Sequence, residues 1–315
     1  MQHKIILDCD PGIDDALALF LALASPEIQF EAITTVNGNV PVEFTTRNAL
    51  ALLELTDRSD IPVARGCARP LLNMPVLADE VHGTNGLGGI ILPEPHLQPL
   101  EKHATDIIIE KVMAAPGEIT LVAIGPLTNL AVALQREPRL AQAVREVVLM
   151  GGAVRVPGNI TPCAEFNIFV DPHAAHAVLH AGWPLRMVSL DTTSQTLLKR
   201  APIAQLAAGG KPILELMQGM IDYYCDIFGG ARGFDAIHMH DPLCMAAVFR
   251  PDLITWEEAY VDVELTGTLT MGETVGYFAH SGKPLPHAPN ARVSVEVDTE
   301  SFIQLFIERI TQAYS

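Results

Sequence analysis

Short apolar runs alternate with helical patterns from the start of the chain to about residue 190, and no other feature of the sequence restricts the fold as strongly. The residues within each run are almost all apolar, whereas a strand with one face in water would alternate apolar and polar residues. Runs of this kind, separated by helices, are typical of a parallel sheet that helices cover on both faces. The predicted strands are KIILD (4–8), FEAITTV (30–36), ITLVAIG (119–125), EVVLMGG (146–152) and LRMVSLD (185–191).

The predicted helices lie between these strands, and the helix at 14–25 is apolar nearly all round, as expected for a helix buried against a sheet. Beyond residue 195 the pattern is helical over 200–228 and β-like over 259–298. We therefore expect an α/β fold: a mostly parallel central sheet with helices on both faces and a C-terminal helical and β elaboration, in a single domain over residues 1–315. The helical patterns lie at 14–25, 43–55, 104–115, 127–135 and 171–182.

The composition is that of a globular, acidic protein. Hydrophobic residues make up 49% of the 315 residues and charged residues 18%, which is ample for a large buried core and argues against disorder. The formal net charge of −17 argues against nucleic acid as a partner, because phosphate binding needs a basic surface. A small neutral or cationic ligand, or a metal ion, is easier to accommodate.

The five cysteines are scattered without a CxxC pair, which indicates reduced thiols in a cytosolic protein. Cys9 lies among aspartates that would raise the pKa of its thiol, so we do not expect a nucleophile there. The N-terminus carries no basic-then-apolar signal segment, and no apolar run reaches the length of a membrane span. These features predict a soluble cytoplasmic protein with no membrane partner.

Four aspartates, Asp8, Asp10, Asp14 and Asp15, fall within eight positions of the stretch KIILDCDPGIDDALALF (4–20). Carboxylates this close repel one another, and burying them without partners is costly or raises their pKa values. One aspartate could be the N-cap of the helix at 14, where its charge would suit the helix dipole. That role explains one aspartate but not four, so we expect a counter-charge.

Glycines and polar residues also follow the other predicted strands. Asn37-Gly38-Asn39 follows the second strand, Ile124-Gly125-Pro126 ends the third and Met150-Gly151-Gly152 ends the fourth. Ligands of open α/β sheets bind beyond the carboxyl ends of the strands, and loop glycines let backbone groups approach a ligand closely. We therefore expect the aspartates to face a hard cation. Calcium fits best on ligand type and magnesium is second, whereas zinc would favour His and Cys.

A later segment, NITPCAEFNIFVDP (159–172), sets Asn159, Glu165 and Asn167 among apolar residues. This arrangement is suited to gripping sugar hydroxyls. The alternative is a polar loop that ends in the helix N-cap Asp171, which explains Asn159 better than it explains the other two.

The segment IHMHDP (237–242) carries two histidines and an aspartate. If the segment is extended, His238 and His240 share one face and Asp241 points the other way. Such a pair, taken alone, favours a structural role.

Together these segments resemble the inosine–uridine nucleoside hydrolase family along nearly the whole chain. DCDPGIDDA (8–16) matches the DxDPGxDDA motif of the family. The nearest in character are bacterial ribonucleoside hydrolases that accept both purine and pyrimidine nucleosides, although the motifs do not specify the base. The other matching segments are TTVNGNV (34–40), VHGTNGLGG (81–89), LVAIGPLTN (121–129), VLMGGA (148–153), TPCAEFNIFVDP (161–172) and HDP (240–242).

The resemblance implies a Ca²⁺ ion held by Asp10, Asp15, Asp241 and the backbone carbonyl of Ile124. The ion would also bind the ribose 2′- and 3′-hydroxyls and the attacking water, and Asp10 would be the general base for that water. Asp8 is not a metal ligand in the family, and we expect it to orient the ligands.

The resemblance also implies the contacts to the substrate. His240 is the candidate acid for the leaving base and flanks that base together with His82. The implied ribose contacts are Asp14, Asn39 and Asn167 for the 2′- and 3′-hydroxyls, Asn159 and Glu165 for the 5′-hydroxyl, and Met150 beneath the sugar.

Two segments depart from the best-known members of the family. The loop after His82 reads GTNG where many relatives have GESG, which bears on its base contacts. Across DYYCDIFGGARGFD (222–235) the Tyr or Arg that some members place at the base does not align. The candidates there are Tyr223, Tyr224, Phe228, Arg232 and Phe234.

The expected function is hydrolysis of the N-glycosidic bond of purine or pyrimidine ribonucleosides to ribose and free base, in nucleoside salvage, by a homodimer or homotetramer. The transition state would be oxocarbenium-like, and anionic neighbours would stabilise it. One alternative is a non-catalytic nucleoside- or ribose-binding module. Another is an aspartate-nucleophile phosphatase, but that motif wants Thr or Val where this chain has Gly12 and gives the pair Asp14-Asp15 no role.

Overall fold

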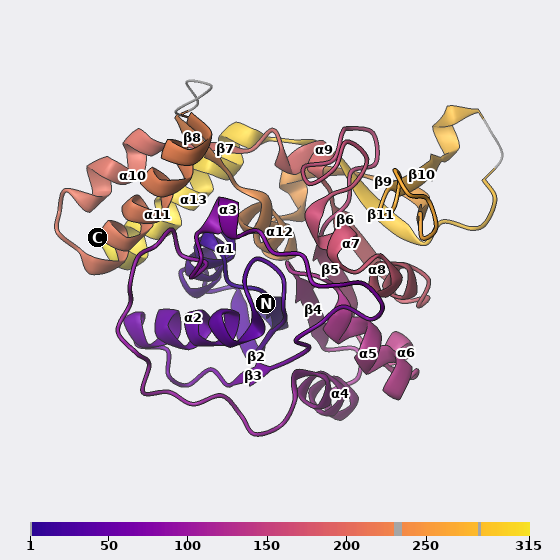
Figure 1. Ribbon diagram of the computed structural model, residues 1–315, viewed down its shortest axis with the longest axis horizontal. Helices are drawn as coiled ribbons and strands as arrows, with labels where there is room; N and C mark the ends of the chain where they lie inside the picture. Colours follow the sequence, from indigo (N-terminus) through magenta and orange to yellow (C-terminus); the bar gives the residue numbers. More distant parts are fainter. Residues whose placement is uncertain (1, 230–234, 283–284) are drawn as a thin grey trace.

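The computed structural model describes residues 2–229, 235–282 and 285–315 (Figure 1). Among these residues, nine strands form one central sheet in the order β10-β9-β11-β6-β5-β4-β1-β2-β3, and β7 (Leu197–Lys199) pairs with β8 (Ala236–His238) separately. The strands of the central sheet are β1 (His3–Cys9), β2 (Ile28–Thr35), β3 (Val63–Arg65), β4 (Ile119–Ala123), β5 (Glu146–Met150), β6 (Leu185–Val188), β9 (Ile254–Val263), β10 (Thr274–Phe278) and β11 (Ala291–Val297).

The middle of the sheet is parallel, which confirms the predicted fold class. β1 pairs in parallel with β2 and β4, and the parallel run continues through β5 and β6. The predicted strand at 185–191 ends early, at Val188, because a helical turn begins at Leu190. The apolar pattern does not predict β3, since three residues are too few to show a period.

The C-terminal β segments belong to the central sheet and do not form a layer of their own. β11 pairs in parallel with β6, and β9 and β10 continue the sheet as antiparallel strands. These strands lie at the right of Figure 1, in orange and yellow. The expected C-terminal elaboration is thus an extension of one sheet edge together with the helices α10 to α13.

Helices surround the sheet, and all five predicted helices are present to within a few residues. Short helical turns occur at α3 (Asp79–His82), α6 (Leu140–Ala143), α7 (Phe166–Val170) and α9 (Leu190–Thr193). The longer helices are α1 (Ile13–Leu23), α2 (Val42–Leu55), α4 (Ala104–Ala114), α5 (Thr128–Arg136), α8 (Pro172–Leu179), α10 (Arg200–Ala207), α11 (Pro212–Gly229), α12 (His240–Phe249) and α13 (Thr299–Tyr314).

Two hydrophobic cores lie on opposite faces of the sheet. Successive side chains of a strand point to opposite faces, so Ile5 and Leu7 of β1 join one core and Ile6 joins the other. The first core contains residues of α1, α2, α11, α12 and α13, and the second contains residues of α4, α5 and α8. This division confirms the prediction of helices on both faces.

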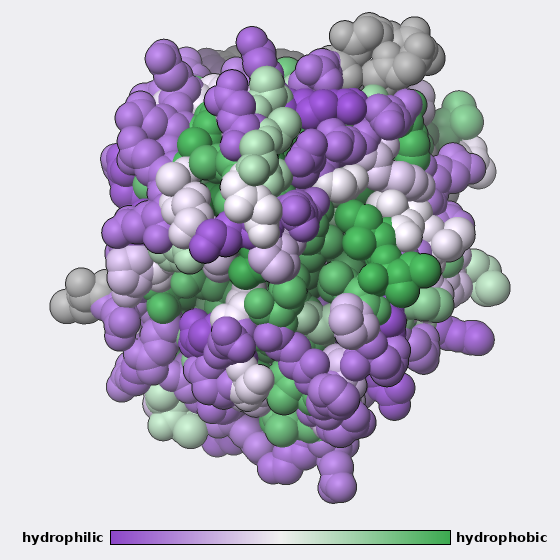
Figure 2. Space-filling model, turned by 90° about the vertical axis from the view of Figure 1, so that its left-hand side faces the viewer, coloured by the Kyte–Doolittle hydropathy of each residue, from purple (hydrophilic) through white to green (hydrophobic). Residues whose placement is uncertain are grey.

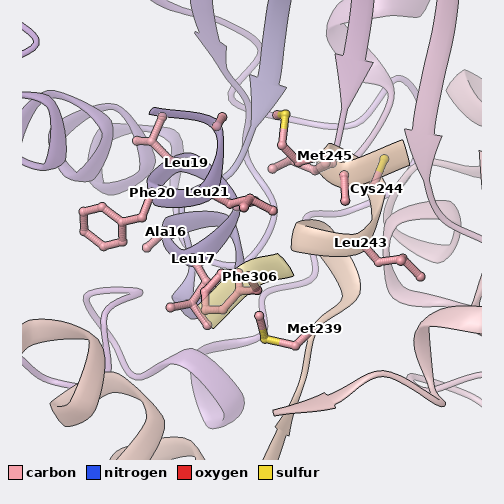
Figure 3. Close-up of a cluster of buried hydrophobic side chains, with 14 of the residues drawn as sticks. Ala16, Leu17, Leu19, Phe20, Leu21, Met239, Leu243, Cys244, Met245 and Phe306 are labelled. Carbon is pink, nitrogen blue, oxygen red and sulfur yellow. The ribbon is translucent and has the colours of Figure 1, made fainter. Parts of the chain in front are cut away.

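The packing of α1 on α12 positions the polar residues described below. Leu17 and Leu21 of α1, Met245 of α12 and Phe306 of α13 are buried in the same cluster, and Figure 3 shows the two helices side by side. α1 carries two aspartates in its first turn, and α12 carries one. The apolar contact therefore brings two acidic helix N-termini together.

The surface is mixed. Figure 2 shows hydrophobic residues gathered in the middle of one face, surrounded by hydrophilic ones. In the part of the chain that the structure describes, no helix is both long enough and apolar enough to cross a membrane.

Candidate active site

Carboxylates from two helices form the floor of a cavity lined by residues of both helices and of the strand ends. Asp14 and Asp15 lie in the first turn of α1, and Asp241 lies in the first turn of α12. One carboxylate oxygen of each lies within 4.8 Å of the others, close enough to share one cation. Helix N-termini favour negative charge, which helps to explain why the carboxylates are tolerated there.

Asp10 follows the end of β1 and is buried beside this group. Its Oδ2 accepts a hydrogen bond from the backbone N–H of Asn39 at 2.6 Å, whereas its Oδ1 is buried with no hydrogen-bond partner. A Cβ atom added at Gly38 or at Gly125 would overlap the Asp10 carboxylate. The glycines at the ends of the neighbouring strands therefore leave the space that Asp10 occupies.

Asp15 ties the loop between β1 and α1 together. Its carboxylate accepts hydrogen bonds from the backbone N–H groups of Asp10 and Gly12, both at 3.0 Å, and from Asn39 Nδ2 at 2.9 Å. Asn39 Nδ2 also donates to the backbone oxygen of Asp10 at 3.2 Å. The loop is thus held by the side chains that the family resemblance assigns to metal and ribose.

The floor has an excess of negative charge. Burial, followed by the neighbouring carboxylates, raises the pKa of Asp10, Asp14 and Asp241, and burial raises that of Asp15. None of the described residues that line the cavity is a lysine or an arginine. The site thus offers three converging carboxylates and a buried carboxylate oxygen without a hydrogen-bond partner. Such oxygen donors are the ligands that a hard cation such as Ca²⁺ binds, and no basic side chain among the described lining residues competes for them.

Asp8 makes its contacts away from the floor. Its Oδ1 accepts hydrogen bonds from Thr34 Oγ1 at 2.5 Å and Asn129 Nδ2 at 2.8 Å, and burial raises its pKa to about 7. Its backbone oxygen accepts from the N–H of Ile124 at 2.9 Å. Asp8 therefore supports the proposed ligand Ile124 through the backbone of the sheet.

The segment 159–172 lines one side of the cavity with Asn159, Glu165 and Asn167. It ends in Asp171, which is the N-cap of α8, as the alternative interpretation expects. Glu165 is the N-cap of α7, where it accepts from the backbone N–H groups of Asn167 and Ile168, yet it also lines the cavity. Asn159 accepts from the backbone N–H of Phe166 at 2.9 Å. Asn167 Nδ2 donates to the carbonyl of Ile124 at 2.9 Å.

Histidines form a further part of the cavity wall, namely His82, His238 and His240. This histidine wall adjoins the floor, since His82 Nδ1 lies 4.0 Å from Asp14 Oδ1. His82 Nδ1 accepts from the backbone N–H of Ile13 at 3.0 Å, and burial lowers the pKa of this ring to about 4. His240 Nδ1 is hydrogen-bonded to Thr193 Oγ1 at 2.7 Å, and burial, followed by the other two histidines, lowers its pKa to about 3. Both rings are therefore neutral near pH 7.

His238 and His240 do share one face, as the alternation predicts. Their rings stack at 5.2 Å with planes 5° apart. His238 Nδ1 is hydrogen-bonded to the Tyr224 hydroxyl at 3.1 Å. Asp241 is not on the opposite face of a strand, however, because β8 ends at His238 and α12 begins at His240.

The remaining candidates from 222–235 fall in different places. Tyr224 lines the cavity, and Tyr223 packs close to Gly88 in the loop after His82. In that loop Asn85 Oδ1 accepts from the backbone N–H groups of Leu87 and Gly89, so the asparagine of GTNG stabilises the turn. Arg232 and Phe234 lie outside the described residues, as does the side chain of Phe228.

The cavity has a volume of about 580 Å³, within the range of small-molecule sites. Sequence reasoning assigned no ligand role to His238, and the lone signal for it was the spacing of the two histidines. The predicted site residues that line the cavity are Asp14, Asn39, His82, Ile124, Met150, Asn159, Glu165, Asn167, His240 and Asp241, while Asp10 and Asp15 lie among the buried groups beside them.

Comparison with known proteins shows which family the chain belongs to. The profile of a family of N-glycosyl hydrolases, the inosine-uridine preferring nucleoside hydrolases, matches residues 5–304. The chain is 42% identical to the pyrimidine-specific ribonucleoside hydrolase RihA of Salmonella arizonae, over 98% of this chain and 99% of the relative. It is 40% identical to RihA of an Enterobacter species, over 99% of both chains.

Solved structures agree. The plant nucleoside hydrolase PpNRh1 superimposes with a TM-score of 0.94 at 37% identity, over 99% of both chains. A purine-preferring ribonucleoside hydrolase from Gardnerella vaginalis gives 0.92 at 32% identity, over 98% of both. The chain belongs to the inosine-uridine preferring nucleoside hydrolase family and is a ribonucleoside hydrolase, an enzyme that splits ribonucleosides into ribose and base. The phosphatase alternative is therefore wrong.

Proposed function

We propose that this enzyme hydrolyses pyrimidine ribonucleosides, with Asp10 as the general base and a bound Ca²⁺ ion at the floor of the cavity. The observation that carries the proposal is the acidic floor, which has no basic side chain among the described lining residues and adjoins histidines whose rings are neutral near pH 7. The carboxylates suit a cation and an oxocarbenium-like sugar, and the hydrogen-bonding rings suit a nucleobase.

The ion would be held by Asp10, Asp15, Asp241 and the carbonyl of Ile124. The unpartnered Oδ1 of Asp10 supports its part in this set, and oxygen ligands favour Ca²⁺ over zinc. A carboxylate oxygen of Asp14 also lies within 4.8 Å of those of Asp15 and Asp241. A ribose hydroxyl bound beside the ion would therefore be within reach of Asp14. When bound, Ca²⁺ supplies positive charge that lowers the pKa of a water and keeps neighbouring carboxylates ionised.

The remaining steps belong to the protein's own side chains. Asp10 takes a proton from the attacking water, and Asp14, Asn39 and Asn167 hold the 2′- and 3′-hydroxyls. As the bond to the base lengthens, positive charge grows on the ribose, and the carboxylates of the floor stabilise it. The rest of the sugar rests on Met150, with Asn159 and Glu165 at the 5′-hydroxyl.

His240 is the proposed acid for the leaving base. If the Thr193 hydroxyl donates to Nδ1, the neutral ring carries its proton on Nε2 and donates a hydrogen bond from there to the leaving base. As negative charge grows on the base, the ring takes up a second proton at Nδ1, and the imidazolium passes its Nε2 proton to the base and returns to the neutral form. His238 stacks on His240 and accepts or donates to Tyr224, which fixes the orientation of the pair. His82 flanks the base from the other side and is held by its bond to Ile13.

The preference for pyrimidines rests on the full-length similarity to pyrimidine-specific relatives. The purine-preferring structure is less similar, at 32% identity against 42%. The test is a kcat/KM panel over uridine, cytidine, inosine, adenosine and xanthosine with Ca²⁺ present. Higher values for uridine and cytidine support the proposal, and higher values for inosine overturn the base preference while leaving the hydrolase assignment intact.

The alternative of a nucleoside- or ribose-binding module without catalysis loses its support, because the chain belongs to a family of hydrolases over residues 5–304. The two functions differ in one measurement, the release of ribose from uridine and inosine in the presence of Ca²⁺. Tight nucleoside binding without ribose release would favour the module.

We also propose that the enzyme works in the cytoplasm in nucleoside salvage, as a homodimer or homotetramer. The hydrophobic residues gathered on the face in Figure 2, and exposed side chains such as Met74 and Ile91, support self-association. Sedimentation velocity at several protein concentrations tests the oligomer, and a monomer at every concentration would contradict it. Cell fractionation tests the compartment.

A further inference from the structure

Two histidines and an aspartate meet far from the carboxylate floor in sequence. His176 lies on α8 and His180 is the C-cap residue of that helix, four positions further along, so both rings project from the same side. Asp262 of β9 lies against them: its Oδ1 is 2.9 Å from His176 Nδ1 and 3.1 Å from His180 Nε2. The two ring centroids are 4.4 Å apart.

The aspartate of this group is anchored and remains charged. Its Oδ1 also accepts from the backbone N–H of Val263 at 2.8 Å, and its Oδ2 accepts from the Tyr260 hydroxyl at 3.2 Å. Partial burial would raise the pKa of Asp262, but the hydrogen bonds from His180, Val263 and His176 outweigh it and lower the pKa to about 2. A fixed anion thus faces two imidazole nitrogens.

The spacing suits a tetrahedral metal ion. Bonds of about 2.0–2.1 Å from zinc to nitrogen or oxygen place ligand atoms roughly 3.3 Å apart. The nitrogens of His176 and His180 would therefore need to move only a few tenths of an ångström from the Asp262 oxygen. Each ring would shift its proton to its other nitrogen, which leaves the coordinating nitrogen with a free lone pair.

We infer that His176, His180 and Asp262 form a second metal site, for a borderline divalent cation of the Zn²⁺ class, which links α8 to β9. Two imidazoles and one carboxylate are the ligand types that zinc, nickel and copper prefer, and Ca²⁺ would avoid such a set. The three side chains are between 29% and 41% exposed, so an ion has access from solvent. His180 also lines a surface hollow of about 410 Å³ with Tyr260 and His287, so water has room to complete the coordination.

The site would act as a clamp at the extended edge of the sheet. β9 is part of the antiparallel extension, whereas α8 covers the parallel strands. A metal bound only by the folded arrangement stabilises it by mass action, because the unfolded chain does not hold the three ligands together. The inference is independent of the catalytic proposal, since it shares no residue with the carboxylate floor.

The test is titration of the untagged, full-length protein with ZnCl₂ by calorimetry, with excess Ca²⁺ present to occupy the acidic floor. The expected result is one Zn²⁺ per chain and a rise in Tm on addition of Zn²⁺. His176→Ala, His180→Ala and Asp262→Asn should each weaken binding at least tenfold and abolish the rise in Tm. His96→Ala removes an exposed histidine outside the group and should change neither result.

Two outcomes would overturn the inference. One is that the Ca²⁺-saturated protein binds no Zn²⁺, and the other is that the affinity for Zn²⁺ is unchanged in all three variants. Circular dichroism of each variant without zinc shows that it is folded. If a single alanine variant fails to fold, Asp262→Asn decides, because it keeps the size of the side chain and the hydrogen bond to Tyr260. Hydrolysis of uridine in Ca²⁺ gives a separate readout of the catalytic proposal.

Discussion

Burial shifts the pKa values of the floor carboxylates and of the histidine wall in opposite directions. Burial raises the pKa of the floor carboxylates and lowers that of His82 and His240, so in each case the neutral form is favoured. A bound cation restores the charge of the floor and does nothing to charge the wall. The comparison teaches that the carboxylates depend on an ion for their charge, whereas the histidines act through hydrogen bonds made by neutral rings.

Removal of the ion should have the largest effect, because every role of the floor depends on it. Dialysis against EGTA is expected to reduce hydrolysis of uridine and of p-nitrophenyl riboside to background, and Ca²⁺ alone is expected to restore both. Elemental analysis of the untreated protein should find one Ca²⁺ per chain. A fully active protein without calcium would refute the assignment, whatever zinc it holds at His176 and His180.

Asp10→Asn should be next in size. The substitution removes the base and a metal ligand, so kcat should fall by roughly 10³-fold or more on both substrates while the protein stays folded. The matched control is Asp8→Asn, another buried aspartate of the same strand end, whose carboxylate bonds to Thr34 and Asn129; less than tenfold loss is expected there. If Asp10→Asn also lost less than tenfold, a barrier change of only about 1.4 kcal/mol, Asp10 would not be the base.

His240→Ala distinguishes the wall from the floor. The leaving group of p-nitrophenyl riboside needs no proton, so the variant should lose kcat on uridine far more than on this substrate. The expected gap is roughly 10²-fold or more, typical of a lost general acid. Equal losses on the two substrates would make His240 a structural residue that positions Asp241, and His82 would become the next candidate acid.

Tyr224→Phe should have the smallest effect of the four. The variant keeps the ring and removes the hydroxyl that bonds to His238, which loosens the histidine pair without removing it. About a tenfold loss on uridine is expected, with little change on p-nitrophenyl riboside. Tyr223→Phe is the control, since Tyr223 packs on the loop at Gly88, and an equal loss there would show that α11 as a whole was disturbed.

Much of the fold could be predicted because long apolar runs carry a clear period. The runs of β1 and α1 are typical, whereas β3 and the turn at Leu190 are too short to show one. The attachment of β11 to β6 could not be predicted, because a strand sequence does not name its neighbour in the sheet.

The site followed the same division. Motif residues such as Asp10 and Asp15 were predicted from local sequence, and the structure brings them to one place. The contact of His176 with Asp262 spans 86 positions, so local sequence could not predict it. The one local feature of the pair of histidines is their spacing of four residues at the end of α8. The hydrogen bond between Tyr224 and His238 likewise could not be predicted, because it depends on how α11 packs against β8 and not on the local sequence of either residue.

The packing of α1 on α12 also sets a time order during synthesis. Asp10 and Asp15 leave the ribosome more than two hundred residues before Asp241 and the helix that supports it. α13, which packs in the same core, follows α12, and its Tyr314 hydroxyl donates to the backbone oxygen of Phe20 at 3.1 Å. A nascent chain therefore carries the first acidic motif in water while those residues are made, and a cation site shared by α1 and α12 forms only after both helices have been synthesised and packed together.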